Sequence, residues 1–204
     1  FHLILVSAIL HSLGVCHSYA QNGPGGANTA DLVLWLGADF EGLGNNVPAA
    51  QVSDRSGKGN DVFSYSGSYS PLNLTNQLNG RPVFSFDGAN DQLKIIGGVS
   101  EMNGANEMSY FVVGQASAAV ARGSFLCLKS SHKGSAFRFF KNNSTFYKNT
   151  LTATGVTATT SAYSAGFQIH SGIWDGGASD FNTYENHSLT GTKSNANGAF
   201  VTCN

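Results

Sequence analysis

The sequence predicts an all-β protein, built as a sandwich or barrel of short strands. Only 11% of the 204 residues are charged, and no window carries Ala, Leu, Glu and Lys on the 3.6-residue period of an amphipathic helix. Short apolar runs are instead separated by clusters of Gly, Ser, Asn and Thr. Runs of this length between turn clusters are typical of all-β domains.

The first 20 residues have the composition of a secretory signal peptide. Leu3–Val15 is mostly apolar, and Ser18 and Ala20 occupy the small-residue positions that precede a cleavage site. The basic n-region is absent, so we expect a truncated leader and a mature chain that begins at Gln21. A buried N-terminal helix or strand is the alternative.

The remaining chain is expected to comprise a linker over 21–30 and one domain over 31–204, long enough for a single core. No other apolar run is long enough to cross a membrane. The formal net charge is −1 and there is no basic patch, so nucleic acid is a poor candidate partner. Cys127 and Cys203 either pair in an oxidising compartment or stay two separate buried thiols.

The expected strands follow from the apolar runs between the turns. Leu32, Leu34 and Leu36 alternate with Val33 and Trp35, which predicts a first strand with two apolar faces. A strand over 83–86 begins after Pro82, where no ladder donor is needed, and the run MSYFVVG at 108–114 is expected to be a central strand. The other expected strands are 125–129, 137–140, 144–148, 166–174 and 182–185. For 149–165, strand and loop are both open.

The segment SDRSGKGND at 53–61 predicts a tight turn. Gly57 and Gly59 tolerate positive φ, and the Asp54 carboxylate is placed to accept hydrogen bonds from backbone N–H groups of the turn. The Gly57-Lys58 pair does not make a Walker loop, because Val52 stands where the first glycine of that motif belongs.

A second acidic turn closes the run RPVFSFDGANDQL at 81–93. Asp87, Asn90 and Asp91 supply two carboxylates and an amide within five residues, and these are the oxygen ligands that Ca²⁺ takes. A turn in which Asp87 accepts backbone hydrogen bonds and Gly88 is left-handed explains the same residues without a metal. Both interpretations are open at the sequence level.

Aromatic side chains in polar surroundings are candidate sugar-stacking platforms, because a ring face packs on the apolar face of a pyranose. Tyr65, Tyr69 and Tyr184 have this context and are the candidate ligand-binding residues. Packed tyrosines with solvated hydroxyls are the alternative. Trp35 and Trp174 are expected in the core.

Four segments carry a family resemblance: DLVLWLGADF at 31–40, SDRSGKGND at 53–61, RPVFSFDGANDQL at 81–93, and the region 172–191 with its W-D-G. Together they resemble the laminin-G-like, concanavalin A-like domains of secreted bacterial proteins. The resemblance implies a two-sheet antiparallel jelly-roll sandwich, secreted or at the cell surface, that lacks its last strands here. His187 stands where the family carries glycine.

The resemblance implies a non-catalytic carbohydrate-binding or adhesion module of a larger protein, with a glycan or an extracellular-matrix-like polymer as partner. The alternative is an accessory or catalytic fragment of a polysaccharide-degrading glycoside hydrolase. Related glucanases use alternate carboxylates on one strand. Here Gly37 precedes Asp39-Phe40-Glu41 where the first carboxylate belongs, and there is no G-x-S-x-G, HExxH or CxxC motif. Catalysis is therefore the less favoured interpretation.

Overall fold

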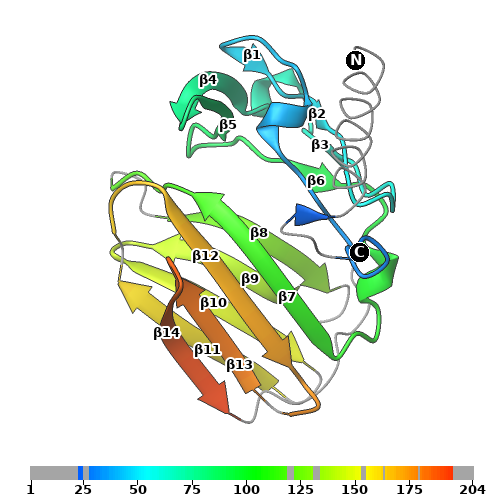
Figure 1. Ribbon diagram of the computed structural model, residues 1–204, viewed down its shortest axis with the longest axis vertical. Helices are drawn as coiled ribbons and strands as arrows, with labels where there is room; N and C mark the ends of the chain where they lie inside the picture. Colours follow the sequence, from blue (N-terminus) through cyan, green and yellow to red (C-terminus); the bar gives the residue numbers. More distant parts are fainter. Residues whose placement is uncertain are drawn as a thin grey trace, which may run out of the picture. The chain divides into compact units, whose positions relative to one another are not determined.

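The computed structural model describes residues 23–24, 28–118, 122–130, 134–152, 155–162, 164–178 and 180–194 (Figure 1). The predicted leader and Cys203 lie outside these residues. The described part of the chain forms strands β1 to β14 in four antiparallel sheets, with short 3₁₀ turns, which confirms the all-β prediction. These residues divide into two compact units. The first runs to Phe86 and includes Asp91–Ile96, and the second comprises Asp87–Asn90 and the chain from Gly97 onward.

The first unit contains two three-stranded sheets. One has the order β1 (Val47–Pro48), β4 (Leu72–Leu78), β5 (Arg81–Ser85), and the other has the order β2 (Gln51–Val52), β3 (Val62–Phe63), β6 (Lys94–Ile95). A small core of Ala49, Val52 and Val62 fills this unit. The apolar residues packed against that core are Leu36, Leu43, Phe84, Leu93 and Ile95.

The strand predicted at 32–36 is wrong, because the backbone of this segment binds a turn instead of a neighbouring strand. The carbonyl of Val33 accepts hydrogen bonds from Ser56 Oγ (3.2 Å) and Asn60 Nδ2 (2.9 Å). The N–H of Trp35 donates to Asp54 Oδ1 (2.9 Å), and its carbonyl accepts from the Arg55 N–H (2.9 Å). Trp35 is only half-buried and meets Phe40 edge to face. The prediction that Trp35 lies in the core is therefore wrong.

The predicted turn at 54–61 is confirmed in detail. Gly57 and Gly59 have φ of 84° and 76°. Besides the Trp35 N–H, the Asp54 carboxylate accepts hydrogen bonds from Ser56 N (2.9 Å), Ser56 Oγ (2.6 Å) and Asn60 N (3.0 Å). Burial is the largest single effect and raises the pKa of Asp54, but these hydrogen bonds together outweigh it and leave the pKa below its ordinary value. The turn therefore holds an ionised carboxylate at its centre.

The second unit contains two four-stranded sheets. One has the order β11 (Gly155–Ala162), β10 (Thr145–Thr152), β9 (Gly134–Asn142), β8 (Arg122–Ser130). The other has the order β14 (Ser188–Ser194), β13 (Asp180–Glu185), β12 (Gln168–Asp175), β7 (Glu107–Gly114). The stretch left open at 149–165 thus contains a strand. MSYFVVG at 108–114 is not central among the described strands, because β7 stands at the end of this order. Successive strands pair within one sheet from β8 to β11 and from β12 to β14, so the jelly-roll connectivity stays a prediction.

One aromatic core joins the two sheets of the second unit. Phe125, Phe139 and Phe146 come from β8, β9 and β10, and their rings surround His170 of β12 at centroid distances of 6.0, 4.7 and 4.8 Å. Trp174 is fully buried as predicted. Cys127 of β8 is exposed, which excludes at this position the alternative of a buried thiol.

The opposite face of the β7-β12-β13-β14 sheet carries large apolar side chains that are exposed. Alternate residues of a strand point to opposite faces. Tyr110 of β7 is therefore buried, whereas its neighbour Phe111 is 75% exposed. The exposed apolar residues of this sheet are Phe111, Val113, Ile169, Ile173 and Leu189.

The β13–β14 hairpin turns through Asn186 and His187, both of which have positive φ (46° and 70°). Asn tolerates this conformation, whereas the Cβ of other residues costs about 1–2 kcal/mol there. We expect His187→Gly to stabilise the second unit by about 1 kcal/mol in chemical denaturation. Asn186→Gly should not stabilise it, because the Asn186 side chain accepts the Ile169 N–H (2.9 Å) and binds Gln168. Equal effects of the two substitutions would contradict this assignment.

Candidate binding surface

The outer face of the β2-β3-β6 sheet presents a row of one amide, one aromatic ring and one amine. Gln51 pairs with Phe63, and Phe63 pairs with Lys94, in adjacent strands. Their neighbours Val52, Val62 and Ile95 enter the core, so the side chains of Gln51, Phe63 and Lys94 point to the other face. Gln51 Nε2 donates to Asp61 Oδ2 (3.2 Å), which orients the amide.

Tyr65 and Tyr69 follow β3 and extend this row. Their rings meet edge to face, with centroids 5.6 Å apart and an interplanar angle of 77°. Tyr65 is 69% exposed, and Lys94 Nζ lies over its ring, 5.6 Å from the centroid. Tyr69 is half-buried, and its carbonyl accepts a hydrogen bond from the Gln92 N–H (2.9 Å). We call Gln51, Phe63, Tyr65, Tyr69 and Lys94 the tyrosine platform.

The structure brings together two of the three predicted ligand-binding residues. Tyr65 and Tyr69 share the tyrosine platform, whereas Tyr184 belongs to β13 of the second unit. Tyr184 is half-buried there, between Ser171 of β12 and Leu189 of β14 in register. Sequence reasoning missed Gln51 and Lys94, because strands of two residues are too short for an alternating pattern to be read.

The predicted calcium turn has the geometry of a hydrogen-bonded turn. Asp87 Oδ1 accepts the N–H groups of Ala89 (2.8 Å) and Asn90 (3.1 Å), and Gly88 has φ of 76°. Asp91 belongs to the first unit and Asp87 to the second. Among the residues that the structure describes, no three His, Cys, Asp or Glu side chains gather where one metal ion could bind them.

Calcium binding by Asp87, Asn90 and Asp91 stays a prediction. An ion bound only to the native state raises the melting temperature by mass action. We therefore expect a chelator to lower the melting temperature and added Ca²⁺ to restore it. Asp91→Asn removes one proposed ligand and keeps the Asp87 carboxylate that accepts the backbone hydrogen bonds of the turn. This variant should abolish the response of the melting temperature to Ca²⁺. A melting curve that ignores both chelator and Ca²⁺ would exclude the site.

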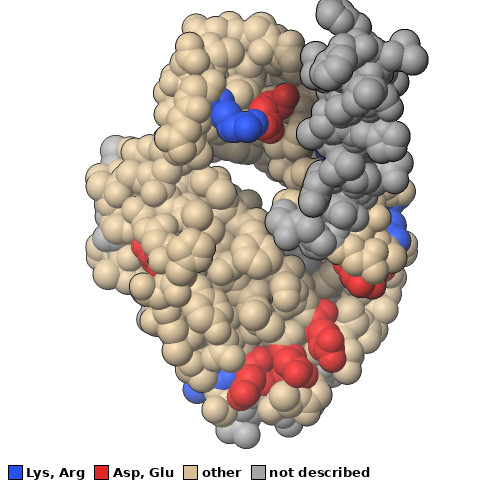
Figure 2. All heavy atoms as spheres, viewed as in Figure 1, with Lys and Arg blue, Asp and Glu red and all other residues tan. Residues whose placement is uncertain are grey.

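Acidic side chains gather at one end of the second unit (Figure 2). Glu107, Asp175 and Asp180 lie opposite one another on the neighbouring strands β7, β12 and β13. Asp175 Oδ1 accepts the N–H groups of Gly177 (2.9 Å) and Ala178 (2.8 Å). One carboxylate of this row thus serves the β12–β13 turn.

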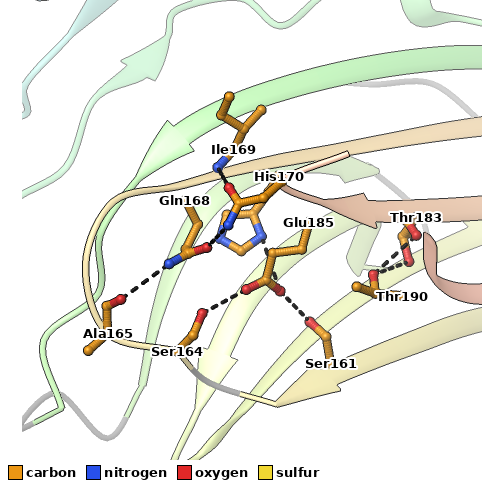
Figure 3. A network of polar contacts seen from close by, with 10 residues as sticks. Ser161, Ser164, Ala165, Gln168, Ile169, His170, Thr183, Glu185 and Thr190 are labelled. Carbon is orange, nitrogen blue, oxygen red and sulfur yellow. Dashed lines mark hydrogen bonds and ion pairs between the residues drawn. The ribbon is translucent and has the colours of Figure 1, made fainter. Parts of the chain in front are cut away.

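Ser161, Ser164, His170 and Glu185 of the second unit form a polar cluster that joins its two sheets (Figure 3). Ser164 Oγ donates to Glu185 Oε1 (2.7 Å), Ser161 Oγ donates to Glu185 Oε2 (3.2 Å), and His170 Nδ1 lies 3.9 Å from Glu185 Oε2. A nucleophilic serine of the Ser-His-Asp type donates its hydroxyl hydrogen bond to an imidazole that acts as general base. Here both hydroxyls bind the carboxylate, and the imidazole is fully buried among aromatic rings. The cluster therefore does not have the serine–imidazole hydrogen bond of such a triad.

The two carboxylates weighed for glycoside hydrolysis bind groups of the first unit. Asp39 Oδ2 pairs with Arg81 Nη1 at 2.5 Å. Glu41 Oε1 accepts the Ser53 N–H (3.0 Å), and its Oε2 accepts the Ser53 hydroxyl (3.4 Å). Both side chains therefore contribute to local structure.

Comparisons with known proteins add a distant likeness. Neither a family model nor a curated protein matches the sequence. Among solved structures, the binding domain of Paraclostridial Mosquitocidal Protein 1 matches with a TM-score of 0.47 and 10% sequence identity. The match covers 84% of this chain and 42% of that chain. The laminin-G-like resemblance thus stays a prediction. In the part of the chain that the structure describes, no helix is long and apolar enough to cross a bilayer.

Proposed function

We propose that this protein is a non-catalytic glycan-binding module of a larger secreted or cell-surface protein, and that it binds sugar on the tyrosine platform. The observation that carries the proposal is the exposed ring of Tyr65, held edge to face against Tyr69. A tyrosine that served only the core would bury its ring and expose at most its hydroxyl.

The platform supplies both kinds of contact that a sugar requires. The Tyr65 ring offers an apolar surface to the C–H face of a pyranose. Gln51 and Lys94 supply polar groups on the same side of the sheet, which suit the hydroxyls at the edge of the sugar. The edge-to-face contact with Tyr69 restricts the Tyr65 ring before binding, which lowers the entropic cost of ordering it.

Titration calorimetry with oligosaccharides, selected first on a glycan array, tests the proposal. Tyr65→Ala should weaken binding about tenfold, equivalent to about 1.4 kcal/mol. Tyr65→Phe should bind almost normally, because the ring is kept. Tyr184→Ala is the control, since it removes a tyrosine of the other unit. Binding that survives Tyr65→Ala and is lost with Tyr184→Ala would move the site to the second unit.

The runner-up, a glycoside hydrolase fragment, predicts that the chain itself cleaves polysaccharides. Because Asp39 and Glu41 hold Arg81 and Ser53, we expect no turnover of laminarin, agarose or similar polysaccharides. Reducing-sugar release over a day measures this directly. Turnover that Asp39→Asn or Glu41→Gln abolishes would establish the hydrolase instead.

A further inference from the structure

Lys94 is a cation of the tyrosine platform that no carboxylate of the described chain neutralises. It is exposed, and its Nζ lies over the Tyr65 ring, 5.6 Å from the centroid. Asp39 pairs with Arg81, and the Glu185 carboxylate binds Ser161 and Ser164, so neither carboxylate engages Lys94. Its charge therefore remains available to a ligand.

Two charged residues of the 54–61 turn, which precedes β3, make contacts with groups other than Lys94. Arg55 donates to the Phe40 carbonyl (2.9 Å) and lies over the Phe40 ring. The Asp61 carboxylate accepts hydrogen bonds from Gln51 Nε2 and from the Asp54 N–H (2.8 Å). Gln51 and Lys94 thus flank Phe63 as one neutral and one positive group.

We infer that the ligand of the tyrosine platform is an acidic glycan, with a carboxylate or sulfate on the sugar that stacks on Tyr65. This inference rests on the proposed function and names its ligand class. The ammonium of Lys94 lies against the ring on which the sugar packs, so an anionic substituent of that sugar comes within its reach. A charge-assisted hydrogen bond to the anion is stronger than the exposed contact of an ammonium with a ring. Binding therefore draws Lys94 from the ring toward the ligand.

The experiment compares four trisaccharides by titration calorimetry at low salt: trigalacturonic acid, its neutral methyl ester, a sulfated galactotriose and unmodified galactotriose. The intact chain should bind the acidic sugars at least tenfold more tightly than their neutral partners. Raising NaCl from 0.05 to 0.5 M should reduce the acidic preference and leave the neutral sugars unchanged, because salt screens exposed charges. The carboxylated and sulfated arms identify which anion is preferred.

Two variants separate this inference from the proposed function. Lys94→Gln should reduce binding of the acidic sugars about tenfold, close to the level of the neutral ones, and should weaken the neutral ones much less, because the introduced amide still donates hydrogen bonds to sugar hydroxyls. Lys58→Gln, which removes an exposed lysine of the 54–61 turn, is the matched control for net charge and should have no effect. Tyr65→Ala should weaken all four sugars.

Equal binding of acidic and neutral sugars, unchanged in Lys94→Gln and lost in Tyr65→Ala, would overturn the acidic preference while the proposed function stands. An acidic preference lost equally in Lys94→Gln and Lys58→Gln would indicate general charge attraction and also overturn the inference. Failure of all four sugars and of the glycan array would overturn both.

Discussion

Gly172→Ala is expected to destabilise the second unit by about 1–3 kcal/mol, the usual cost of overpacking a filled interior. Gly172 lies directly opposite Tyr110 on β7. A Cβ at this position would lie 2.7 Å from Tyr110 Cζ and 2.8 Å from its hydroxyl oxygen. The Tyr110 ring is buried against Phe139, and because protein interiors are close-packed, relieving this overlap must displace the ring or the strands that hold it.

The measurement uses the two tryptophans of the sequence, since Trp35 belongs to the first unit and Trp174 to the second. In a Trp35→Phe background, the fluorescence of buried Trp174 reports unfolding of the second unit alone. Gly67→Ala is the control, because a Cβ there meets nothing within 4 Å. Tyr110→Val should relieve much of the penalty of Gly172→Ala in a double-mutant cycle. Additive effects would show that the two residues do not clash.

Asp54→Ala is expected to destabilise the first unit by roughly 2–3 kcal/mol, because hydrogen bonds to a charged group contribute about 1.5–3 kcal/mol. The substitution removes four of them at once and leaves the N–H groups of Trp35, Ser56 and Asn60 without their acceptor. Hydrogen exchange at these three amides should accelerate with the loss of stability. Asp31→Ala is the control, because Asp31 is exposed and precedes the 32–36 segment. This variant should leave the stability unchanged.

The same carboxylate predicts a pH dependence. The pKa of Asp54 is lower in the folded protein than in the unfolded chain, whose aspartates titrate at about 3.9. The unfolded chain therefore binds more protons at acid pH, and the contribution of Asp54 is complete above pH 4 and lost as pH falls through the folded value. Asp54→Asn should flatten this acid limb. An identical acid limb in that variant would show that Asp54 is not the group that titrates.

Local turn chemistry was predictable from the sequence. Gly57, Gly59 and Asp54 specify their turn through backbone conformation and side-chain acceptors within a few residues of one another. The conformation of 32–36 was not predictable in this way. Its apolar alternation is that of a strand, but its hydrogen-bond partners lie in a turn about twenty residues away. The same alternation in MSYFVVG gave the strand but not its place at the end of the sheet, which depends on pairing with β12.

The candidate site was half predictable. Polar context identified Tyr65 and Tyr69, but their contact with each other and with Lys94 depends on pairing between β3 and β6, which lie about thirty residues apart. Tyr184 has the same polar context and lies in the other unit. Context alone therefore does not distinguish a shared platform from a separate surface residue.

The exposed apolar face of the β7-β12-β13-β14 sheet bears on how the protein is handled at the bench. Phe111, Val113, Ile169, Ile173 and Leu189 present aliphatic and aromatic groups to the buffer. Sulfate and phosphate strengthen the tendency of such surfaces to leave water. Ammonium sulfate should therefore promote association of the protein through this face. Sodium chloride at the same ionic strength should promote it less.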